Sequence, residues 1–417
     1  MLNIDKIRKD FPMISNTNFV YFESAATSYK PQVVIDRVNR YYTNETCNIH
    51  RGDYDISYQV STEYDDVRKI CQKFINADSY KEIVFTSGAS ASLNLVAYGY
   101  AQKFLKKGDV ILTSEAEHAS NILPLFKVAE MTGAVIEYVE LNSDGTFNLD
   151  NFKAKMNDKV KLVSLAHVSN VLGYITPMKE ITKLAHEYGA VVICDGAQSV
   201  PHIVTDVQDL DIDFLCFSAH KMLGPSGVGV LYGKYELLEK MDPFMLGGGS
   251  NARFDICGNI LLKNPPYKFE AGTPCIEGVL GFGEALKYLM EVGMQNIQEY
   301  NADLQEYFLK RMSELPNVEV YNKLCDTSIV TFNVKDKDSL KNIFAQDAAC
   351  YLNKQGFAVR SGNHCAKILL NVIGVSETIR ASLYLYNTKE EIDEFVDVLK
   401  DITLNKCIEA AIWWMKI

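Results

Sequence analysis

Short apolar segments alternate with helix-like segments between residues 80 and 235, and this alternation limits the possible folds more than any other feature. Each apolar segment has four to six residues and is soon followed by turn formers, as buried strands are. Strands that alternate with helices form β-α-β units, which join parallel strands of one sheet. The sequence therefore predicts an α/β fold around a mostly parallel sheet, with strands near 82–86, 110–113, 135–139, 161–166, 191–194, 214–217 and 229–232.

The pattern changes beyond residue 290. Long amphipathic stretches at 297–313 and 389–404 flank short strand candidates at 328–333 and 379–385, which is typical of a smaller α+β domain. A chain of 417 residues is long enough for two domains. We expect a large domain over 15–290 and a small domain over 291–417 that also includes the N-terminal segment 1–14.

Polar side chains follow two neighbouring strands of the predicted sheet. Asp195 and Gln198 come after the strand at 191–194, and Ser218, His220 and Lys221 come after the strand at 214–217. The carboxyl ends of parallel strands meet at the edge of the sheet where ligands usually bind. Pyridoxal phosphate requires a lysine that holds it covalently, an aspartate for its ring nitrogen and donors for its phosphate. Each residue alone is more typical of a turn or a solvated strand end, but together they indicate a site for this cofactor.

A second anion site is predicted where the strand at 82–86 turns into a helix. The turn contains Gly88, Ala89 and Ser90, and the first N–H groups of a helix lack partners within it. Taken alone, this segment is better interpreted as an ordinary strand-to-helix turn. The sequence lacks the Walker pattern, so we do not expect a nucleoside triphosphate here.

Composition excludes several classes of partner. The net charge of −11 opposes binding to nucleic acid and to acidic membrane surfaces. Residues 1–13 are charged and lack the apolar stretch of a signal peptide, and no segment is apolar enough to cross a bilayer. We therefore expect a cytoplasmic enzyme without membrane or nucleic-acid partners.

The ten cysteines show no C-x-x-C pair and no zinc-type spacing, so no metal is expected. Cys194 and Cys216 lie inside apolar runs, where free cysteine behaves as a small apolar residue. Cys365 differs because it follows Gly362, Asn363 and His364 in a polar loop. We expect a reactive thiol there rather than a passenger.

These segments resemble the cofactor site of class V, fold-type I pyridoxal phosphate enzymes, and specifically the SUF-type cysteine desulfurases. The similarity extends from about Tyr21 to Ser382, and the segment 359–366 resembles the active-site cysteine loop of that family. Further matching motifs lie at 50–52, 117–118, 167–173 and 271–274. The resemblance implies a fold-type I transferase with a large mixed sheet and a smaller α+β domain.

The resemblance also implies roles around the cofactor ring. Lys221 would hold the cofactor and carry protons, and Asp195 would keep the ring nitrogen protonated. Gln198 and Asn170 would bond the ring hydroxyl. His118 would stack on the ring with an acid/base role, although a helix cap is an equally good prediction without the resemblance.

The phosphate would be held by the N–H groups of Ala89 and Ser90, the hydroxyls of Ser90 and Ser218, and His220. The family usually has two threonines where this chain has Ala89 and Ser90, so Ala89 offers only its backbone. By similarity, Thr273 would reach the phosphate in the other subunit, which implies a homodimer.

The remaining implied residues concern the substrate, L-cysteine. Arg380 would clamp its α-carboxylate with a bidentate fork, helped by Arg360 and Asn170. Cys365 would attack the substrate sulfur, which leaves alanine and a persulfide on the protein, and Arg360 and His364 would favour its thiolate form. Many relatives carry histidine where this chain has Asn363.

The resemblance implies that the sulfur passes to a small acceptor protein, for iron–sulfur cluster assembly or for another thiolation route. Alternatives on the same fold are a selenocysteine lyase, an aminotransferase and a kynureninase-like hydrolase. Cys365 argues against the last two, because neither needs a nucleophilic thiol. A non-catalytic scaffold is a further alternative, which the presence of Lys221, Asp195 and Cys365 disfavours.

Overall fold

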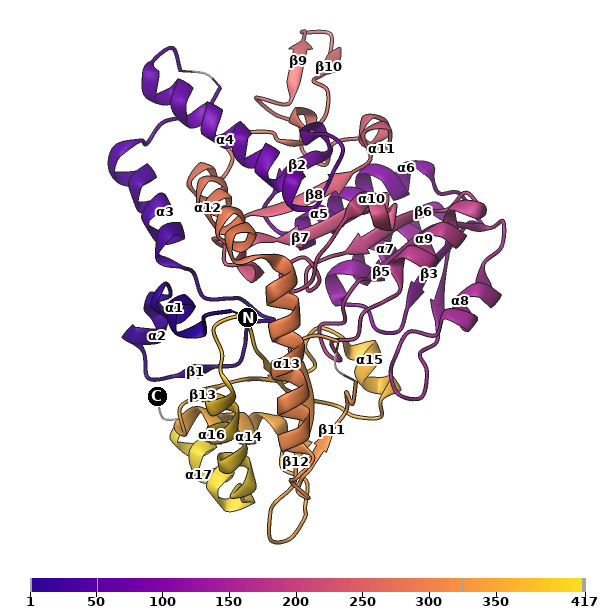
Figure 1. Ribbon diagram of the computed structural model, residues 1–417. Coiled ribbons are helices and arrows are strands. Elements are labelled where there is room, and N and C mark those ends of the chain that lie inside the picture. The colour runs from indigo at the N-terminus through magenta and orange to yellow at the C-terminus, as the bar shows by residue number, and fades with distance from the viewer. Residues whose placement is uncertain (1, 51, 325, 415–417) are drawn as a thin grey trace.

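The computed structural model describes residues 2–50, 52–324 and 326–414. Within them a seven-stranded sheet has the strand order β2-β8-β7-β6-β5-β3-β4 (Figure 1). The strands are parallel except β8, which runs antiparallel to both of its neighbours. The predicted α/β class with a mostly parallel mixed sheet is therefore confirmed. The strands are β2 (Ile83–Thr86), β3 (Val110–Ser114), β4 (Val135–Val139), β5 (Val160–Ala166), β6 (Val191–Asp195), β7 (Phe214–Ser218) and β8 (Gly229–Gly233).

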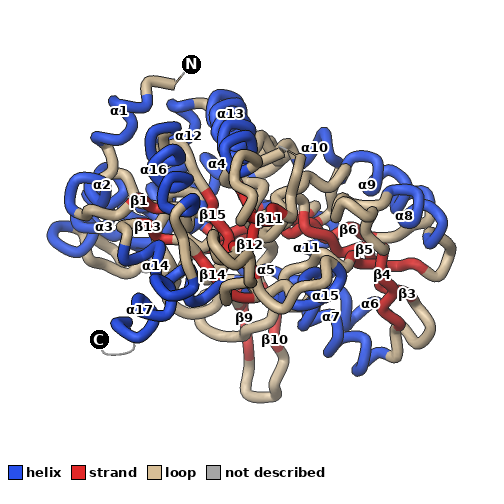
Figure 2. The backbone as a smooth tube through the Cα atoms, turned by 90° about the horizontal axis from the view of Figure 1, so that it is seen from below, coloured by secondary structure: helices blue, strands red, loops and turns tan. Residues whose placement is uncertain are grey.

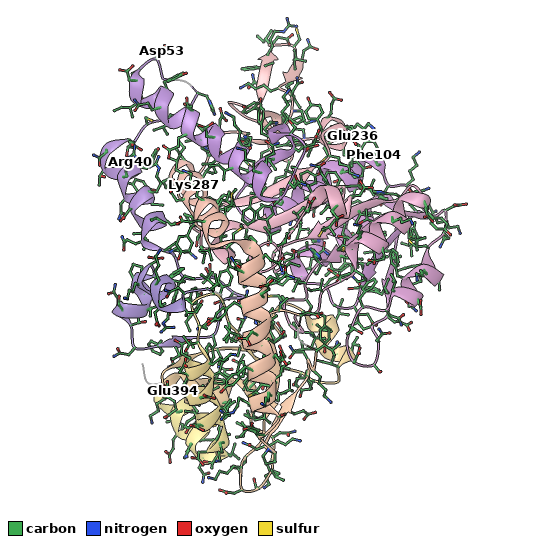
Figure 3. All side chains as sticks on the ribbon, viewed as in Figure 1. Arg40, Asp53, Phe104, Glu236, Lys287 and Glu394 are labelled. Carbon is green, nitrogen blue, oxygen red and sulfur yellow. The ribbon has the colours of Figure 1, made fainter. Side chains whose placement is uncertain are left out.

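Helices cover both faces of this sheet, which explains why its strands are apolar without interruption. On β6, Ile193 belongs to the hydrophobic cluster on one face and Cys194 to the cluster on the other, and Phe214 and Leu215 on β7 divide in the same way. Helices α5 and α7 pack on the first face, and α4, α9 and α12 on the second. Charged side chains such as Arg40, Glu236 and Glu394 extend outward (Figure 3). The helices of this part are α3 (Gln32–Asn44), α4 (Asp55–Phe74), α5 (Ala89–Val96), α6 (Gln102–Phe104), α7 (Ala119–Thr132), α8 (Leu149–Lys155), α9 (Met178–Glu187), α10 (Val207–Leu210), α11 (Tyr235–Lys240) and α12 (Ile276–Val292).

A second, antiparallel sheet lies in the C-terminal part of the described chain, with the order β11-β12-β15-β14. Its apolar core is closed by α13, which runs between the two sheets, and by three further helices (Figures 1 and 2). Cys407 and Ala410, near the end of the described chain, are buried in this core. The elements are α13 (Met294–Met312), β11 (Val318–Val320), β12 (Ile329–Val334), α14 (Ala345–Lys354), β14 (Arg360–Gly362), α15 (Lys367–Val372), β15 (Thr378–Ser382), α16 (Lys389–Lys400) and α17 (Leu404–Trp414).

We propose the division into 15–290 and 291–417 from these two cores. We assign segment 1–14 to the C-terminal part because Arg8 Nη1 donates to the Tyr386 carbonyl and to Glu391 Oε1. The N-terminal segment contributes to both cores. Ile7 of α1 (Ile4–Lys9) and Phe11, just before α2 (Pro12–Asn16), pack in the core of the large sheet, whereas Phe22 packs in the core of the small one. Strand β1 (Val20–Tyr21) pairs with β13 (Phe357–Ala358), which ties this segment to the C-terminal part.

A β-hairpin projects from the body of the molecule, in a part of the chain where the sequence predicts no strand. It consists of β9 (Asn251–Phe254) and β10 (Ile260–Leu262) (Figures 1 and 2). Phe254, Ile256 and Leu261 are exposed on it. No helix in the described residues has the length and apolar character that a membrane span requires.

A charge network fastens the edge of the large sheet opposite the carboxyl ends of its parallel strands. His186 of α9 lies with Nδ1 3.1 Å from Asp211 Oδ2 and Nε2 2.9 Å from Asp213 Oδ2. Lys234 Nζ reaches the same two carboxylates at 2.6 and 3.0 Å. An imidazole can donate from both nitrogens only when it is protonated. The hydrogen bond to Asp213 accordingly raises the pKa of His186.

The stability of the protein should therefore depend on the charge of His186. Because its folded-state pKa is raised, its contribution is complete below the unfolded pKa of about 6.5 and is lost as the pH rises through the folded value. We expect His186→Gln to cost on the order of 1 kcal/mol at about pH 6 and much less at about pH 8.5. Urea unfolding of both proteins at both pH values measures this, and an equal cost at both would contradict it.

Candidate active site

The predicted cofactor and substrate residues converge on one cavity at the carboxyl ends of β5, β6 and β7. The cavity has a volume of about 230 Å³. It lies between the large sheet and β14 and β15 of the small sheet. All the predicted residues except Thr273 line it, namely Ala89, Ser90, His118, Asn170, Asp195, Gln198, Ser218, His220, Lys221, Arg360, Cys365 and Arg380. Their proximity is thus observed, while their individual roles remain predictions.

Asp195 and Lys221 form the base of the cavity. Asp195 ends β6, is buried, and accepts a hydrogen bond of 3.0 Å from the Ala197 N–H on Oδ1. Burial raises the pKa of Asp195, while Ala197 and Lys221 oppose that rise. Lys221 ends a single 3₁₀ turn, Ala219–Lys221, directly after β7. Burial lowers the pKa of Lys221 to about 8, so part of the amine is neutral and nucleophilic near pH 7.

The anion site at the start of α5 lies against β8. A Cβ atom on Gly229 would come within 2.4 Å of the Cα of Gly88, so this approach requires glycine. The Ala89 N–H donates to Ser218 Oγ at 2.7 Å, which leaves the Ser218 hydroxyl proton free for a ligand. Burial lowers the pKa of His220 to about 4, so His220 is a neutral partner.

The sequence allowed two roles for His118, a helix cap and a cofactor contact. In the structure His118 caps a helix and also lines the cavity. It caps the start of α7, where Nδ1 accepts a hydrogen bond of 3.1 Å from the Ser120 N–H. Burial, Lys221 and the two cavity arginines lower the pKa of His118 to about 4. The neutral ring therefore carries its proton on Nε2, which suits a partner that stacks on a ring or donates a hydrogen bond.

Glu117 fixes the position of the start of α7, next to His118, and the sequence did not predict this role. Its carboxyl group accepts hydrogen bonds from Ser114 Oγ, Asn121 Nδ2 and the Ala166 N–H at 2.5, 2.7 and 2.8 Å. These bonds tie the start of α7 to the carboxyl end of β5. Burial raises the pKa of Glu117 to about 7.

Two arginines lie side by side on adjacent strands of the small sheet. Arg360 and Arg380 are directly paired residues of β14 and β15, a placement that like charges disfavour. Arg380 is only 2% exposed, and its Nη1 donates to the Asn170 carbonyl at 2.8 Å. Its Nε and Nη2 have no partner among the described residues. This edge of a guanidinium matches a carboxylate, so the site is suited to an anionic ligand.

Cys365 lies in a tightly held loop at the cavity mouth. Its side chain is exposed, and both His364 and Cys365 have left-handed backbone, with φ of 50° and 58°. The Cys365 N–H donates to Asn363 Oδ1 at 3.0 Å, and its carbonyl accepts from the Ala119 N–H at 2.7 Å. Strained backbone of this kind is maintained where function requires it.

His364 does not supply a positive charge to this loop. It is buried, with Nε2 2.9 Å from Thr378 Oγ1, and burial lowers its pKa to about 3. Of the two residues expected to favour a thiolate, Arg360 is therefore the cation.

The family model of class-V aminotransferases matches residues 20–395. A probable cysteine desulfurase of Halalkalibacterium halodurans is 42% identical over 94% of this chain and 96% of its own length. One of Synechocystis is 42% identical over 94% of each chain. The chain belongs to the class-V aminotransferase family, among its cysteine desulfurases.

Solved structures from this family have the same fold. A cysteine desulfurase of Escherichia coli superposes with a TM-score of 0.89 at 33% identity, covering 98% of this chain and 99% of its own. The apo enzyme of Thermococcus onnurineus gives 0.90 at 35% identity, covering 96% and 98%.

Two contacts in this cavity concern Gln198, which the sequence predicted, and Ser120, which it did not. Gln198 Nε2 donates to the Ala25 carbonyl at 2.8 Å, and Gln198 Oε1 has no partner among the described residues. Ser120 Oγ lies 2.7 Å from Ser90 Oγ. No sequence signal identified Ser120, because it reaches Ser90 only through the packing of α7 beside α5.

Thr273 lies outside this cavity, in a second one of about 440 Å³ that is also lined by His50, Lys263 and Glu270. Its predicted role in the other subunit stays a prediction; Arg51 of the neighbouring motif lies outside the described residues. In the part of the chain that the structure describes, no group of three potential ligands could hold a metal ion.

Because Arg380 Nε and Nη2 have no partner among the described residues, we predict that they bind the carboxylate of the ligand. We expect Arg380→Lys to weaken the binding of amino acids roughly 10- to 100-fold, because lysine cannot reproduce a bidentate bond. Arg40→Lys, on the surface, is the matched control. Titration calorimetry with L-alanine measures both, and an unchanged affinity in Arg380→Lys would assign the carboxylate to another residue.

Proposed function

We propose that this protein is a pyridoxal phosphate-dependent cysteine desulfurase, which converts L-cysteine to L-alanine and holds the sulfur as a persulfide on Cys365. The observation that carries the proposal is the exposed Cys365 thiol beside Lys221, Asp195 and Arg380 in one cavity. Its relatives at 42% identity are named probable cysteine desulfurases.

The cavity fits pyridoxal phosphate by the chemistry of its unused groups. Lys221 offers a partly neutral amine and Asp195 a buried acceptor for a ring nitrogen. Gln198 offers a buried oxygen that is unpaired among the described residues. The start of α5 and Ser218 offer donors for a phosphate. When bound, the cofactor supplies an electron sink for charge that develops at the substrate Cα.

The residues of this chain then have separate tasks. Arg380 binds the substrate carboxylate and fixes its Cα near Lys221, which takes and returns the proton there. The neutral His118 presents Nε2–H to the cofactor side of the cavity. In the last step, the Cys365 thiolate attacks the substrate sulfur, the carbon–sulfur bond breaks, and the carbon fragment gains a proton to leave as alanine.

The alternative activities on this fold differ in their need for Cys365. Transamination and kynureninase-like hydrolysis proceed without a nucleophilic thiol. A selenocysteine lyase would use the same residues, so relative rates with L-cysteine and L-selenocysteine decide between the two substrates.

We further propose a homodimer in which Thr273 completes the partner's phosphate site. Exposed apolar residues gather on the segments that flank the Thr273 cavity, which a second copy of the chain would cover. They include Phe244, Met245 and Leu246 before the hairpin, Phe254 and Leu261 on it, and Tyr54 and Tyr58 at the start of α4.

The sulfur would pass from Cys365 to a small acceptor protein for iron–sulfur cluster assembly. An exposed thiol can hand on sulfur by direct contact between two proteins. We place the protein in the cytoplasm, because the described cysteines are free thiols, which persist in a reducing compartment.

Cys365→Ala tests the desulfurase proposal. It should retain the bound cofactor, because no predicted cofactor contact is lost, while alanine and sulfide formation from L-cysteine falls at least roughly 100-fold and the persulfide disappears. Cys257→Ala, which removes another exposed thiol, is the control. Product assay and intact-protein mass spectrometry give both readouts, and wild-type turnover by Cys365→Ala would make this thiol a passenger.

The shared site predicts complementation between protomers. Thr273→Val should lower cofactor affinity roughly 10-fold, the cost of one lost hydrogen bond to a charged group. Lys221→Ala should not turn over at all. Mixed dimers of these two variants have one site with both residues intact, so mixing should raise activity above that of either variant at a cofactor concentration that leaves the Thr273→Val sites mostly empty. If Thr273 served its own protomer, mixing would restore nothing.

A further inference from the structure

The two groups that would bind an amino acid come from different sheets. Arg380 lies on β15 of the small sheet, and Lys221 lies in the turn after β7 of the large sheet. An α-amino acid carries its carboxylate and its amine on one carbon. The distance between Arg380 and the Lys221 turn must therefore be held within a narrow range.

One short segment, Ser24 to Lys30, is bonded to both sides, and we name it the strap. At its first end the Ser24 N–H donates to the Ser382 carbonyl at 3.1 Å, and the Ala25 N–H donates to Ser382 Oγ at 2.9 Å. Ser382 lies two residues beyond Arg380 on the same strand. The Tyr386 hydroxyl lies 2.8 Å from Ser24 Oγ and accepts from the Tyr29 N–H at 3.1 Å.

The second end of the strap holds the backbone beside Lys221. The His220 carbonyl accepts from the Ser28 N–H at 3.0 Å, from Thr27 Oγ1 at 2.9 Å and from Lys30 Nζ at 3.0 Å. Ser28 Oγ accepts from the Leu223 N–H at 2.8 Å. Leu223 has left-handed backbone, with φ of 66°, so this bond stabilises a conformation that leucine rarely adopts.

The hydrogen bonds of the Lys30 ammonium group all go to the strap and to the turn that carries Lys221. Its Nζ contacts Thr27 Oγ1, the Ser28 carbonyl and the His220 carbonyl, and no carboxylate among the described residues pairs with it. Partial burial without a counter-charge lowers the pKa of Lys30 to about 8. A half-buried cation bonded only to neutral oxygens costs free energy that a neutral residue would avoid.

We propose that the strap sets the position of Lys221 relative to Arg380, with Ser28 and Lys30 as its positioning residues. Neither side chain lines the cavity, so both act through the His220–Leu223 backbone. The inference rests on the proposed function, because it assumes that Lys221 carries the cofactor and Arg380 the substrate carboxylate. It assigns the segment 24–30 a role in alignment.

Ser28→Ala and Lys30→Met test the strap. A displaced Lys221 should lower kcat for L-cysteine roughly 10- to 100-fold, with KM changed less than roughly 3-fold, since Arg380 still binds the carboxylate. The pH midpoint of the bound cofactor's absorbance change should shift by about half a unit, because the surroundings of the Lys221 nitrogen change. Lys30→Arg keeps the cation and its donors and should lie between Lys30→Met and the wild type.

Lys69→Met is the control, since Lys69 is exposed on α4 and pairs only with Asp66. A purely stabilising strap would lower the melting temperature of Ser28→Ala and Lys30→Met and leave kcat and the pH midpoint at wild-type values, which would overturn the inference. The pH midpoint needs bound cofactor but no turnover. A shifted midpoint in a protein that releases no sulfur would support the strap and refute the desulfurase.

Discussion

The parallel pairing of β6 with β7 is the constraint on which the site depends. It places Asp195 opposite Cys216, so a buried carboxylate ends one strand while the chain leaves the next strand into the Lys221 turn. Burial disfavours the charged forms of both Asp195 and Lys221, and the opposite charge of each residue partly offsets this effect on the other. A shift of one residue in this register would turn one of the two groups to the opposite face of the sheet.

Positive charge dominates the rest of the cavity. Among the described residues that line it, Lys221, Arg360 and Arg380 are accompanied by one carboxylate, Asp195, and burial keeps His118, His220 and His364 neutral. The site therefore attracts anions through fixed cations and supplies neutral imidazoles as hydrogen-bond partners. Such a field stabilises a phosphate and an amino-acid carboxylate alike, as the proposed function requires.

The cavity forms at the seam between two sheets, and several bonds hold that seam. The Asn170 carbonyl accepts a hydrogen bond from Arg380, and Asn170 Nδ2 donates to the His364 carbonyl at 2.8 Å. Asn170 follows β5 of the large sheet, so it links that sheet to Arg380 and to the loop that carries Cys365. Thr327 Oγ1 donates to the Gly173 carbonyl at 3.0 Å nearby. The strap adds a second connection on the other side of Lys221.

The sequence by itself determined the strands of the large sheet and the chemical identities of most residues in the site. Apolar segments that end before Asp195 and Ser218 predicted both the parallel sheet and the residues at its mouth, because strand periodicity and turn chemistry depend on near neighbours in the chain. Only the tertiary structure decided that Arg360 faces Arg380, that three histidines are neutral, that Thr273 lies outside the cavity, and that residues 24–30 brace Lys221. Burial and through-space charge depend on segments separated by up to several hundred residues, and no local pattern records which of them will meet.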